Sequence, residues 1–256
     1  MISRRAAPEE QPALQALWQR VFGDGPEVTE AFFRFFPPKV HTRVIGAPGQ
    51  IASMASWIPV TLCTRDAAQR GAYLYAVATA PEHRGRGLAR TLLGELEQAL
   101  AGAGMDFACL CPAERSLYDY YGAQGYEAAF YCTRFHAQTG QESALTPVDA
   151  QTYRSVRRSC LAAPYCEWDD AAYAYLQATG TRLYTFPGGC AAISALPDGS
   201  ARVPELLADR PAQAAAKLGL PGAEVFAPGI KQPRGMIKYF TFGQKIPRAY
   251  LGFSFD

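Results

Sequence analysis

The stretch from Tyr73 to Leu93 reads Tyr-Leu-Tyr-Ala-Val-Ala-Thr-Ala-Pro-Glu-His-Arg-Gly-Arg-Gly-Leu-Ala-Arg-Thr-Leu-Leu. Its first part, Tyr73 to Thr79, has the composition of a strand; Pro81 interrupts it, and a glycine-rich turn then opens into a helix predicted over Gly87 to Leu100. Glycines at 85 and 87 allow the backbone to approach a ligand closely. The unpaired N–H groups and the dipole of the first helical turn favour a bound anion. This strand–turn–helix unit therefore predicts a phosphate-binding site.

Two common phosphate-binding motifs fit this segment poorly. A Walker loop needs Gly-Lys-Ser or Gly-Lys-Thr after four spacer residues, and no lysine occurs here. A Rossmann fingerprint needs a third small residue where Arg90 stands. It also needs an acidic ribose ligand after the next strand, where Cys111 and Pro112 are found. The segment is typical of neither family.

A third motif fits the same residues well. The hexapeptide Arg84-Gly-Arg-Gly-Leu-Ala89 resembles the Arg/Gln-x-x-Gly-x-Gly/Ala signature of the GNAT superfamily of N-acetyltransferases, and Tyr75 to Pro81 is similar to the strand before it. The resemblance implies that the backbone of the turn binds the pyrophosphate of acetyl-CoA, and that the strand contacts the pantetheine arm and the thioester. The cofactor-binding residues implied in this way are Val77, Ala78, Thr79, Arg84, Gly85, Arg86, Gly87, Leu88 and Ala89.

A second segment supports the same family. Leu117 to Tyr126 resembles the later GNAT motif, a helix that carries a tyrosine four residues before a Gly-Phe or Gly-Tyr pair, and Tyr121 stands at that position. The resemblance implies that Tyr121 is the general acid that protonates the leaving thiolate. The alternative is that these tyrosines only pack a helix. Tyr118 lies three residues earlier on the same helical face, and it is a candidate wall or substitute acid.

The group that removes the amine proton is less well marked. The strand from Tyr73 to Ala80 carries no acid, and Glu82 and His83 lie beside the phosphate turn. A resemblance to the tandem acetyltransferases of the enhanced-intracellular-survival type implies that a C-terminal carboxylate reaches the active site. Asp256 is therefore a candidate catalytic residue; the alternative is a frayed terminus.

The chain divides into two halves with a similar order of predicted elements. The first half is expected to contain two helices, three strands that include Val40 to Ile45, a helix, a strand, a helix and a strand. The second half repeats much of this order, and a strand pair, Met236 to Phe242 and Ala249 to Phe255, closes it. We therefore predict an α/β fold of two tandem GNAT-like domains, 1–138 and 139–256, each a mixed central sheet flanked by helices.

The phosphate turn is predicted in the first half alone. At the corresponding place in the second half, Leu207 to Gln213 contains no glycine, and Asp209 would repel a phosphate. The resemblance to the survival-type enzymes covers both halves, but the specific motifs lie in the first. We expect residues 139–256 to be a degenerate domain that lacks the cofactor site and covers one side of the acceptor site.

The composition limits the kinds of partner that the protein is expected to bind. The 256 residues are 49% hydrophobic and 19% charged, which is globular composition, and the net charge of +2 does not favour nucleic acid. No run approaches the roughly 20 apolar residues of a membrane helix, and no signal peptide is recognised, so a cytoplasmic location is expected. The seven cysteines are scattered, and no metal site or disulfide framework is predicted.

The sequence therefore predicts an acyltransferase that moves an acetyl group from acetyl-CoA directly to a primary amine in a ternary complex. The acceptor is expected to be a small-molecule or peptide amine, and neither its identity nor the oligomeric state can be predicted. Two alternatives stay open. One is a non-catalytic acyl-CoA-binding or scaffolding protein, and the other is a transferase of tandem GNAT-like fold that uses aminoacyl-tRNA.

Overall fold

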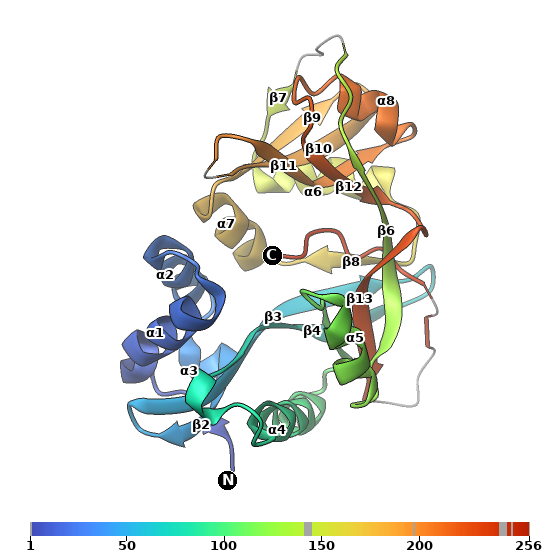
Figure 1. Ribbon diagram of the computed structural model, residues 1–256. Helices are drawn as coiled ribbons and strands as arrows, with labels where there is room; N and C mark the ends of the chain where they lie inside the picture. Colours follow the sequence, from blue (N-terminus) through green and yellow to red (C-terminus); the bar gives the residue numbers. More distant parts are fainter. Residues whose placement is uncertain (1, 141–144, 197, 241–244, 247, 256) are drawn as a thin grey trace.

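A computed structural model describes residues 2–140, 145–196, 198–240, 245–246 and 248–255 of the chain. Its strands form one large mixed sheet with helices against both faces, which confirms the predicted α/β class. In Figure 1 the sheet runs from a lower lobe, which contains the first half of the chain, into an upper lobe, which contains most of the second half. None of the helices in these ranges is long and apolar enough to cross a membrane.

The first half follows the predicted order of its longer helices and strands, and it adds a two-residue strand at Arg4–Arg5 and a short helix at Pro38–His41 that were not predicted. Residues 40–41, expected to begin a strand, end a short helix instead, because Pro38 at the first helical position favours a new turn. The elements are β1 (Arg4–Arg5), η1 (Pro8–Glu10), α1 (Gln11–Phe22), α2 (Pro26–Phe35), α3 (Pro38–His41), β2 (Thr42–Ala47), β3 (Gln50–Cys63), β4 (Ala68–Thr79), η2 (Pro81–His83), α4 (Leu88–Gly102), β5 (Phe107–Leu110), α5 (Arg115–Gly122) and β6 (Glu127–His136).

The second half contains two short strands that were not predicted, residues 146–147 and 165–168, and it also differs from expectation at its end. Residues 249–255 are not a strand: Ala249 and Tyr250 form single bridges, and positive φ angles at Gly252 (+83°) and Phe255 (+54°) turn the backbone out of the extended conformation. The elements are β7 (Thr146–Pro147), α6 (Ala150–Cys160), β8 (Tyr165–Trp168), α7 (Asp170–Ala178), β9 (Thr181–Phe186), β10 (Gly189–Ala195), β11 (Ala201–Ala208), α8 (Pro211–Ala216), β12 (Glu224–Pro228) and β13 (Gln232–Tyr239).

The sheet passes from one lobe to the other without a break. Its strand order is β1-β2-β3-β4-β5-β13-β6-β12-β11-β10-β9-β7, with β8 paired to β3. Strand β6 is shared: its first half pairs with β13 and its second half with β12 (Figure 1). Strand β13, late in the chain, thus inserts between β5 and β6 of the lower lobe. The two lobes are joined through this insertion, and the division at residue 138 stays a prediction.

Apolar side chains pack on both faces of the lower sheet. Helices α1 and α2 cover one face, and α4 covers the other with a helical row of leucines. On that second face Glu97 of α4 is buried, where it accepts hydrogen bonds from Tyr126 Oη (2.7 Å) and from Lys238 Nζ on β13 (2.5 Å). This contact ties the inserted strand to the helix that follows the predicted phosphate turn.

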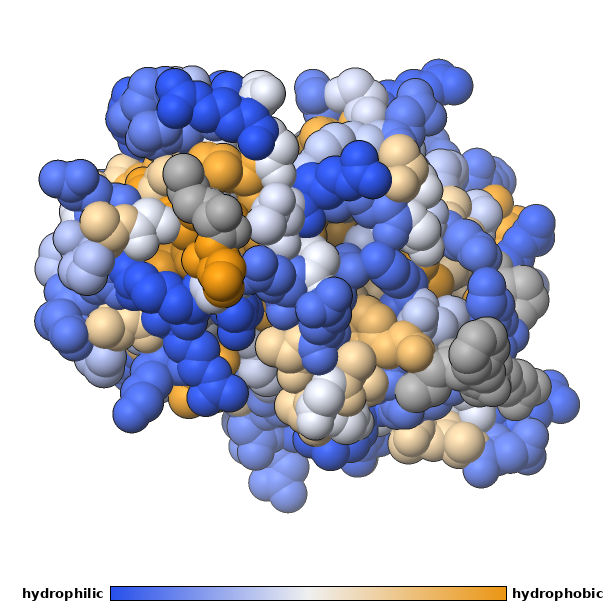
Figure 2. All heavy atoms as spheres, turned by 90° about the horizontal axis from the view of Figure 1, so that it is seen from below, coloured by the Kyte–Doolittle hydropathy of each residue, from blue (hydrophilic) through white to orange (hydrophobic). Residues whose placement is uncertain are grey.

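The surface seen from below is mostly hydrophilic, with hydrophobic residues in patches (Figure 2).

A buried carboxylate fastens the N-terminal segment to the lower lobe. Glu10 is 5% exposed and accepts hydrogen bonds from both terminal nitrogens of Arg4 (2.6 and 2.7 Å), from Ala7 N (2.9 Å) and from Gly49 N (3.2 Å). The hydrogen bond from Arg4 lowers the pKa of Glu10 to about 2. A carboxyl whose pKa is lowered by folding stabilises the protein at pH values above its unfolded pKa of 4.5, and this stabilisation is lost as the pH falls toward 2.

We expect Glu10→Gln to lower the free energy of unfolding by about 2 kcal/mol at pH 7, because it removes a charged acceptor from a buried site. The difference from the wild type should close between pH 4.5 and pH 2, where the wild-type carboxyl itself takes up a proton. Urea unfolding over this pH range measures both effects. The exposed neighbour Glu9 supplies the control, since Glu9→Gln should change little at any pH. A Glu10→Gln difference that is independent of pH would contradict the assignment.

Candidate active site

Strands β4 and β5 separate at the centre of the lower sheet. They pair in parallel from Gly71 opposite Phe107 as far as Tyr73 opposite Cys109, and β4 then continues to Thr79 paired with β3 and no longer with β5. A bulge accompanies the separation: the register of β4 against β3 shifts, and Ala76 has a positive φ of +49° although it is not glycine. A bulge bends its strand, so the backbone of β4 leaves the β5 edge and opens a slot beside it.

The predicted phosphate turn lies directly after this strand. Gly85 and Gly87 have φ angles of +74° and +72°, a conformation that glycine adopts without steric cost, and Gly87 is the N-cap of α4. Glycine has no side chain to cap the helix, so no side-chain cap bonds the first amides of α4. The first bond back to the cap is from Thr91 N to Gly87 O (3.0 Å). The exposed Arg84 and Arg86 add positive charge, and the turn is suited to bind an anion.

The three strand residues predicted to contact the cofactor face different ways. Val77 lines the cavity described below. The carbonyl of Ala78 accepts a hydrogen bond from Ser53 Oγ on β3, and Thr79 Oγ1 pairs with the same hydroxyl, both at 2.9 Å. The carbonyl of Thr79 also accepts from Arg84 Nε (3.3 Å), which fixes the entry into the turn. Ala78 and Thr79 thus hold the strand against β3, while Val77 faces the slot.

A cavity of about 470 Å³ lies between the two lobes at the end of this slot. The first half supplies one wall, with Val77 of β4, Cys111 after β5, and Tyr121 of α5. Asp24 and several residues of the second half complete it, and the sequence did not single these residues out. Other residues that line the cavity are Trp18, Tyr73, Tyr75, Tyr175, Arg202, Phe253, Ser254 and Phe255.

Tyr121 reaches this cavity from α5. Its side chain is 8% exposed, and its ring contacts those of Tyr120 and Tyr126 at 5.1 and 5.7 Å between centroids. Burial disfavours the phenolate and raises the pKa of Tyr121 to about 12, so the phenol keeps its proton at neutral pH. Tyr118 is half-buried on the same helix and is not among the residues that line the cavity. The geometry thus favours Tyr121 over Tyr118 as a proton donor within the cavity.

The sequence predicted a catalytic carboxylate at the end of the chain, Asp256. Asp256 lies outside the described residues, but the carbonyls of Ser254 and Phe255 before it accept hydrogen bonds from Tyr73 Oη and Tyr75 Oη, each at 2.7 Å. Among the described residues, the carboxylate that lines the cavity is Asp24, whose Oδ2 accepts from the indole N–H of Trp18 at 2.7 Å. Glu82, beside the phosphate turn, instead pairs with Arg20 at the surface.

The corresponding turn of the second half has a different structure. Strand β11 ends at Ala208, the exposed Asp209 and Arg210 follow, and α8 begins at Pro211. The helix is only 6 residues long, and a carboxylate stands where the first half has glycine. This turn shows neither the glycine conformation nor the long helix that makes the first turn suited to an anion.

A diverging strand, a glycine turn at a helix N-terminus and a buried phenol are features that an acyl-CoA-dependent acyltransferase would need. Residues 3–129, just under half of the chain, match the model of the acetyltransferase (GNAT) domain. A comparison with curated proteins finds no match.

Solved structures share the fold over both lobes. A GCN5-related N-acetyltransferase from Kribbella flavida is 19% identical with a TM-score of 0.68, and the alignment covers 93% of this chain and 71% of that one. Another from Anabaena variabilis ATCC 29413 is 19% identical with a TM-score of 0.69, covering 92% and 71%. Eis1 from Mycobacterium abscessus is 13% identical with a TM-score of 0.63, covering 93% and 74%. At these identities the likeness concerns the fold.

Proposed function

We propose that this protein is an N-acetyltransferase that transfers the acetyl group of acetyl-CoA to a primary amine by direct attack in a ternary complex. The observation that supports this most strongly is the arrangement along one strand. The edge of β4 that faces β5 is unpaired with it beyond Tyr73, Val77 of this stretch lines the cavity together with Tyr121, and the glycine turn before α4 follows shortly after the strand. A diphosphate at the turn and a thioester in the cavity are the two groups that the pantetheine arm of an acyl-CoA connects.

The chemistry requires two proton movements. The amine nitrogen attacks the thioester carbonyl carbon, a C–N bond forms, the C–S bond breaks, and the sulfur leaves as a thiolate. In our proposal Tyr121 gives its proton to this sulfur, because a protonated sulfur is the better leaving group. The amine loses one proton to a carboxylate, for which Asp24 in the cavity and Asp256 after Phe255 are the candidates, and this proton returns to the phenol through solvent.

The two parts of the chain have separate roles in this proposal. Residues 1–138 carry the cofactor site, with Arg84, Arg86 and the turn at Gly87 on the pyrophosphate and Val77 on the pantetheine arm. Residues 139–256 are a GNAT-like domain without a phosphate turn. Tyr175 and Arg202 of this domain line the cavity, which supports a role in forming the acceptor side of the site.

Calorimetric titration with acetyl-CoA tests the cofactor assignment, and we expect binding at one site per chain. Release of free CoA thiol with a panel of primary amines then tests turnover. Binding with turnover supports the enzyme, binding without turnover of any amine would favour the acyl-CoA-binding alternative, and no binding would favour the aminoacyl-tRNA alternative. Desulfo-CoA controls for binding, since it keeps the diphosphate and lacks the thioester.

A further inference from the structure

The C-terminal segment, residues 249–255, crosses between the lobes without regular secondary structure. Ala249 N donates to Ala129 O (2.9 Å), and Tyr250 exchanges backbone hydrogen bonds with the start of β8, donating to Pro164 O (3.1 Å) and accepting from Cys166 N (2.7 Å). The segment then enters the cavity, where Phe253, Ser254 and Phe255 form part of the lining. Figure 1 shows the chain end between the two lobes. The segment is thus a wall of the proposed active site.

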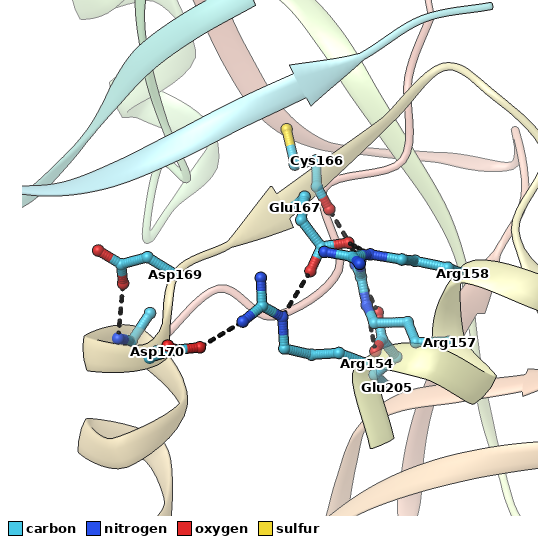
Figure 3. Close-up of polar contacts among 9 residues, drawn as sticks. Arg154, Arg157, Arg158, Cys166, Glu167, Asp169, Asp170 and Glu205 are labelled. Carbon is cyan, nitrogen blue, oxygen red and sulfur yellow. Dashed lines mark hydrogen bonds and ion pairs between the residues drawn. The ribbon is translucent and has the colours of Figure 1, made fainter. Parts of the chain in front are cut away.

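A fully buried ion pair lies beneath this segment. Arg157 of α6 and Glu205 of β11 are both 0% exposed, and two nitrogens of the guanidinium donate to the two carboxylate oxygens at 2.9 and 3.1 Å. A third nitrogen donates to Cys166 O (2.9 Å), and Tyr153 Oη donates to Glu205 (2.9 Å). Figure 3 shows Arg157 pointing at Glu205 and at the backbone of Cys166. Such a two-pronged pair fixes the position of both side chains.

Gly252 rests directly on this pair. A Cβ at this position would lie 2.6 Å from Nη2 of Arg157 and 2.8 Å from Oε1 of Glu205. Both atoms belong to buried, mutually bonded side chains, so neither can move into solvent to make room. The left-handed φ of +83° at Gly252 also favours glycine. The ion pair therefore sets how closely the segment approaches the upper lobe, and in which direction it continues.

The lower lobe holds the same segment from the opposite side. Tyr73 and Tyr75, on β4, donate their hydroxyl protons to the carbonyls of Ser254 and Phe255. Residues of the second half complete these surroundings: the ring of Phe255 contacts Trp168 of β8 at 4.8 Å and stacks on Tyr175 of α7 at 6.0 Å between centroids. Phe255 keeps a left-handed φ of +54°, which is unfavourable for a residue with a Cβ and needs such surroundings to persist.

We propose that Arg157 and Glu205 are positioning residues, which act through Gly252 to place Phe253–Phe255 as the acceptor-side wall of the cavity. This inference rests on the proposed function, since it takes the cavity as the place of acetyl transfer. A hydrophobic pair of similar volume could be equally stable there, so the charges matter for geometry more than for stability. The contacts given for residues 249–255 do not include the phosphate turn, so we expect the diphosphate contacts, and with them most of the affinity for acetyl-CoA, to be retained when the segment shifts.

Gly252→Ala is the direct test. We expect amide hydrogen exchange in the peptide covering residues 249–255 to become about tenfold faster, because the segment must lift from the ion pair. With the best amine of the panel, kcat/KM for the amine should fall about tenfold or more, while the Kd for acetyl-CoA stays within about twofold. Gly188→Ala is the matched control: Gly188 has a similar φ of +88°, and its Cβ would meet nothing within 4 Å.

A second variant removes the ion pair without leaving a buried charge. Arg157→Met with Glu205→Met should fold, because apolar side chains replace both partners. We expect the same faster exchange and the same loss in kcat/KM for the amine. Unchanged exchange or unchanged turnover in both variants would overturn the proposal. If the wild type does not bind acetyl-CoA, the proposed function fails, and hydrogen exchange alone then decides whether the pair positions the segment.

Discussion

Gly87→Glu should abolish measurable acetyl-CoA binding, with a rise in Kd of about 100-fold or more. Gly87 is the N-cap of α4, and the amides that follow it are the proposed diphosphate ligands. A glutamate at this place puts a carboxylate against the positive end of the helix dipole, where the protein's own anion replaces the ligand and also repels it. The loss of two charge-assisted hydrogen bonds, at about 1.5 kcal/mol each, corresponds to roughly 100-fold in affinity. Calorimetric titration measures the change.

The other end of the same helix supplies the control for this variant. Gly104 has a φ of +78°, close to the +72° of Gly87, and a Cβ at either position would meet nothing within 4 Å. Gly104→Glu therefore carries the same backbone strain and the same charge, and it should leave acetyl-CoA affinity unchanged. Gly87→Gln separates bulk from charge, and we expect its Kd to lie between those of wild type and Gly87→Glu. Equal affinity of Gly87→Glu and wild type would contradict the cofactor site.

The cofactor side of the site is predictable from sequence because it is local. A strand, two glycines in left-handed conformation and a leucine-rich helix follow one another within Tyr73–Leu100, so composition and spacing are enough to place them. Tyr121 is separated from this unit by one strand only. Its distance from the Gly125-Tyr126 pair is a sequence property, and the structure shows that α5 carries its ring to the cavity.

The acceptor side cannot be predicted in the same way. Asp24, Tyr175 and Arg202 come from three distant elements, and they meet because β13 inserts between β5 and β6 and brings the upper lobe over the slot. No local pattern in the sequence encodes that pairing, because a strand of the second half has the same alternation of residues whichever strand it pairs with.

The end of the chain misleads for a related reason. Leu251, Phe253 and Phe255 alternate with small residues, which is typical of a strand with one buried face. In the structure the alternation instead reflects packing between two lobes, and the small residue Gly252 is required by the buried ion pair beneath it. An alternation of apolar residues indicates that one side of the segment is buried. That burial can result from packing between two lobes as well as from a place in a sheet.

Tyr121→Phe should lower kcat by about 100-fold or more while the Kd for acetyl-CoA stays within about twofold. The substitution removes only the phenolic O–H. The ring contacts with Tyr120 and Tyr126 remain, so the fold and the cavity wall are kept. Burial raises the pKa of Tyr121 to about 12, and the wild-type phenol therefore stays protonated near pH 10, where an exposed tyrosine is half ionised. The ratio of wild-type to variant kcat should thus be the same at pH 7 and pH 9.

Tyr118→Phe is the matched control, because Tyr118 lies on the same helix and burial also raises its pKa to about 12, yet it does not line the cavity. We expect its kcat to stay within about threefold of wild type, since proton transfer requires hydrogen-bond reach of the reacting atom. Steady-state thiol release with the best amine of the panel measures all three proteins. Equal turnover by wild type and Tyr121→Phe would remove Tyr121 from the mechanism. A loss confined to Tyr118→Phe would instead assign the proton donor to Tyr118, one turn earlier on the helix.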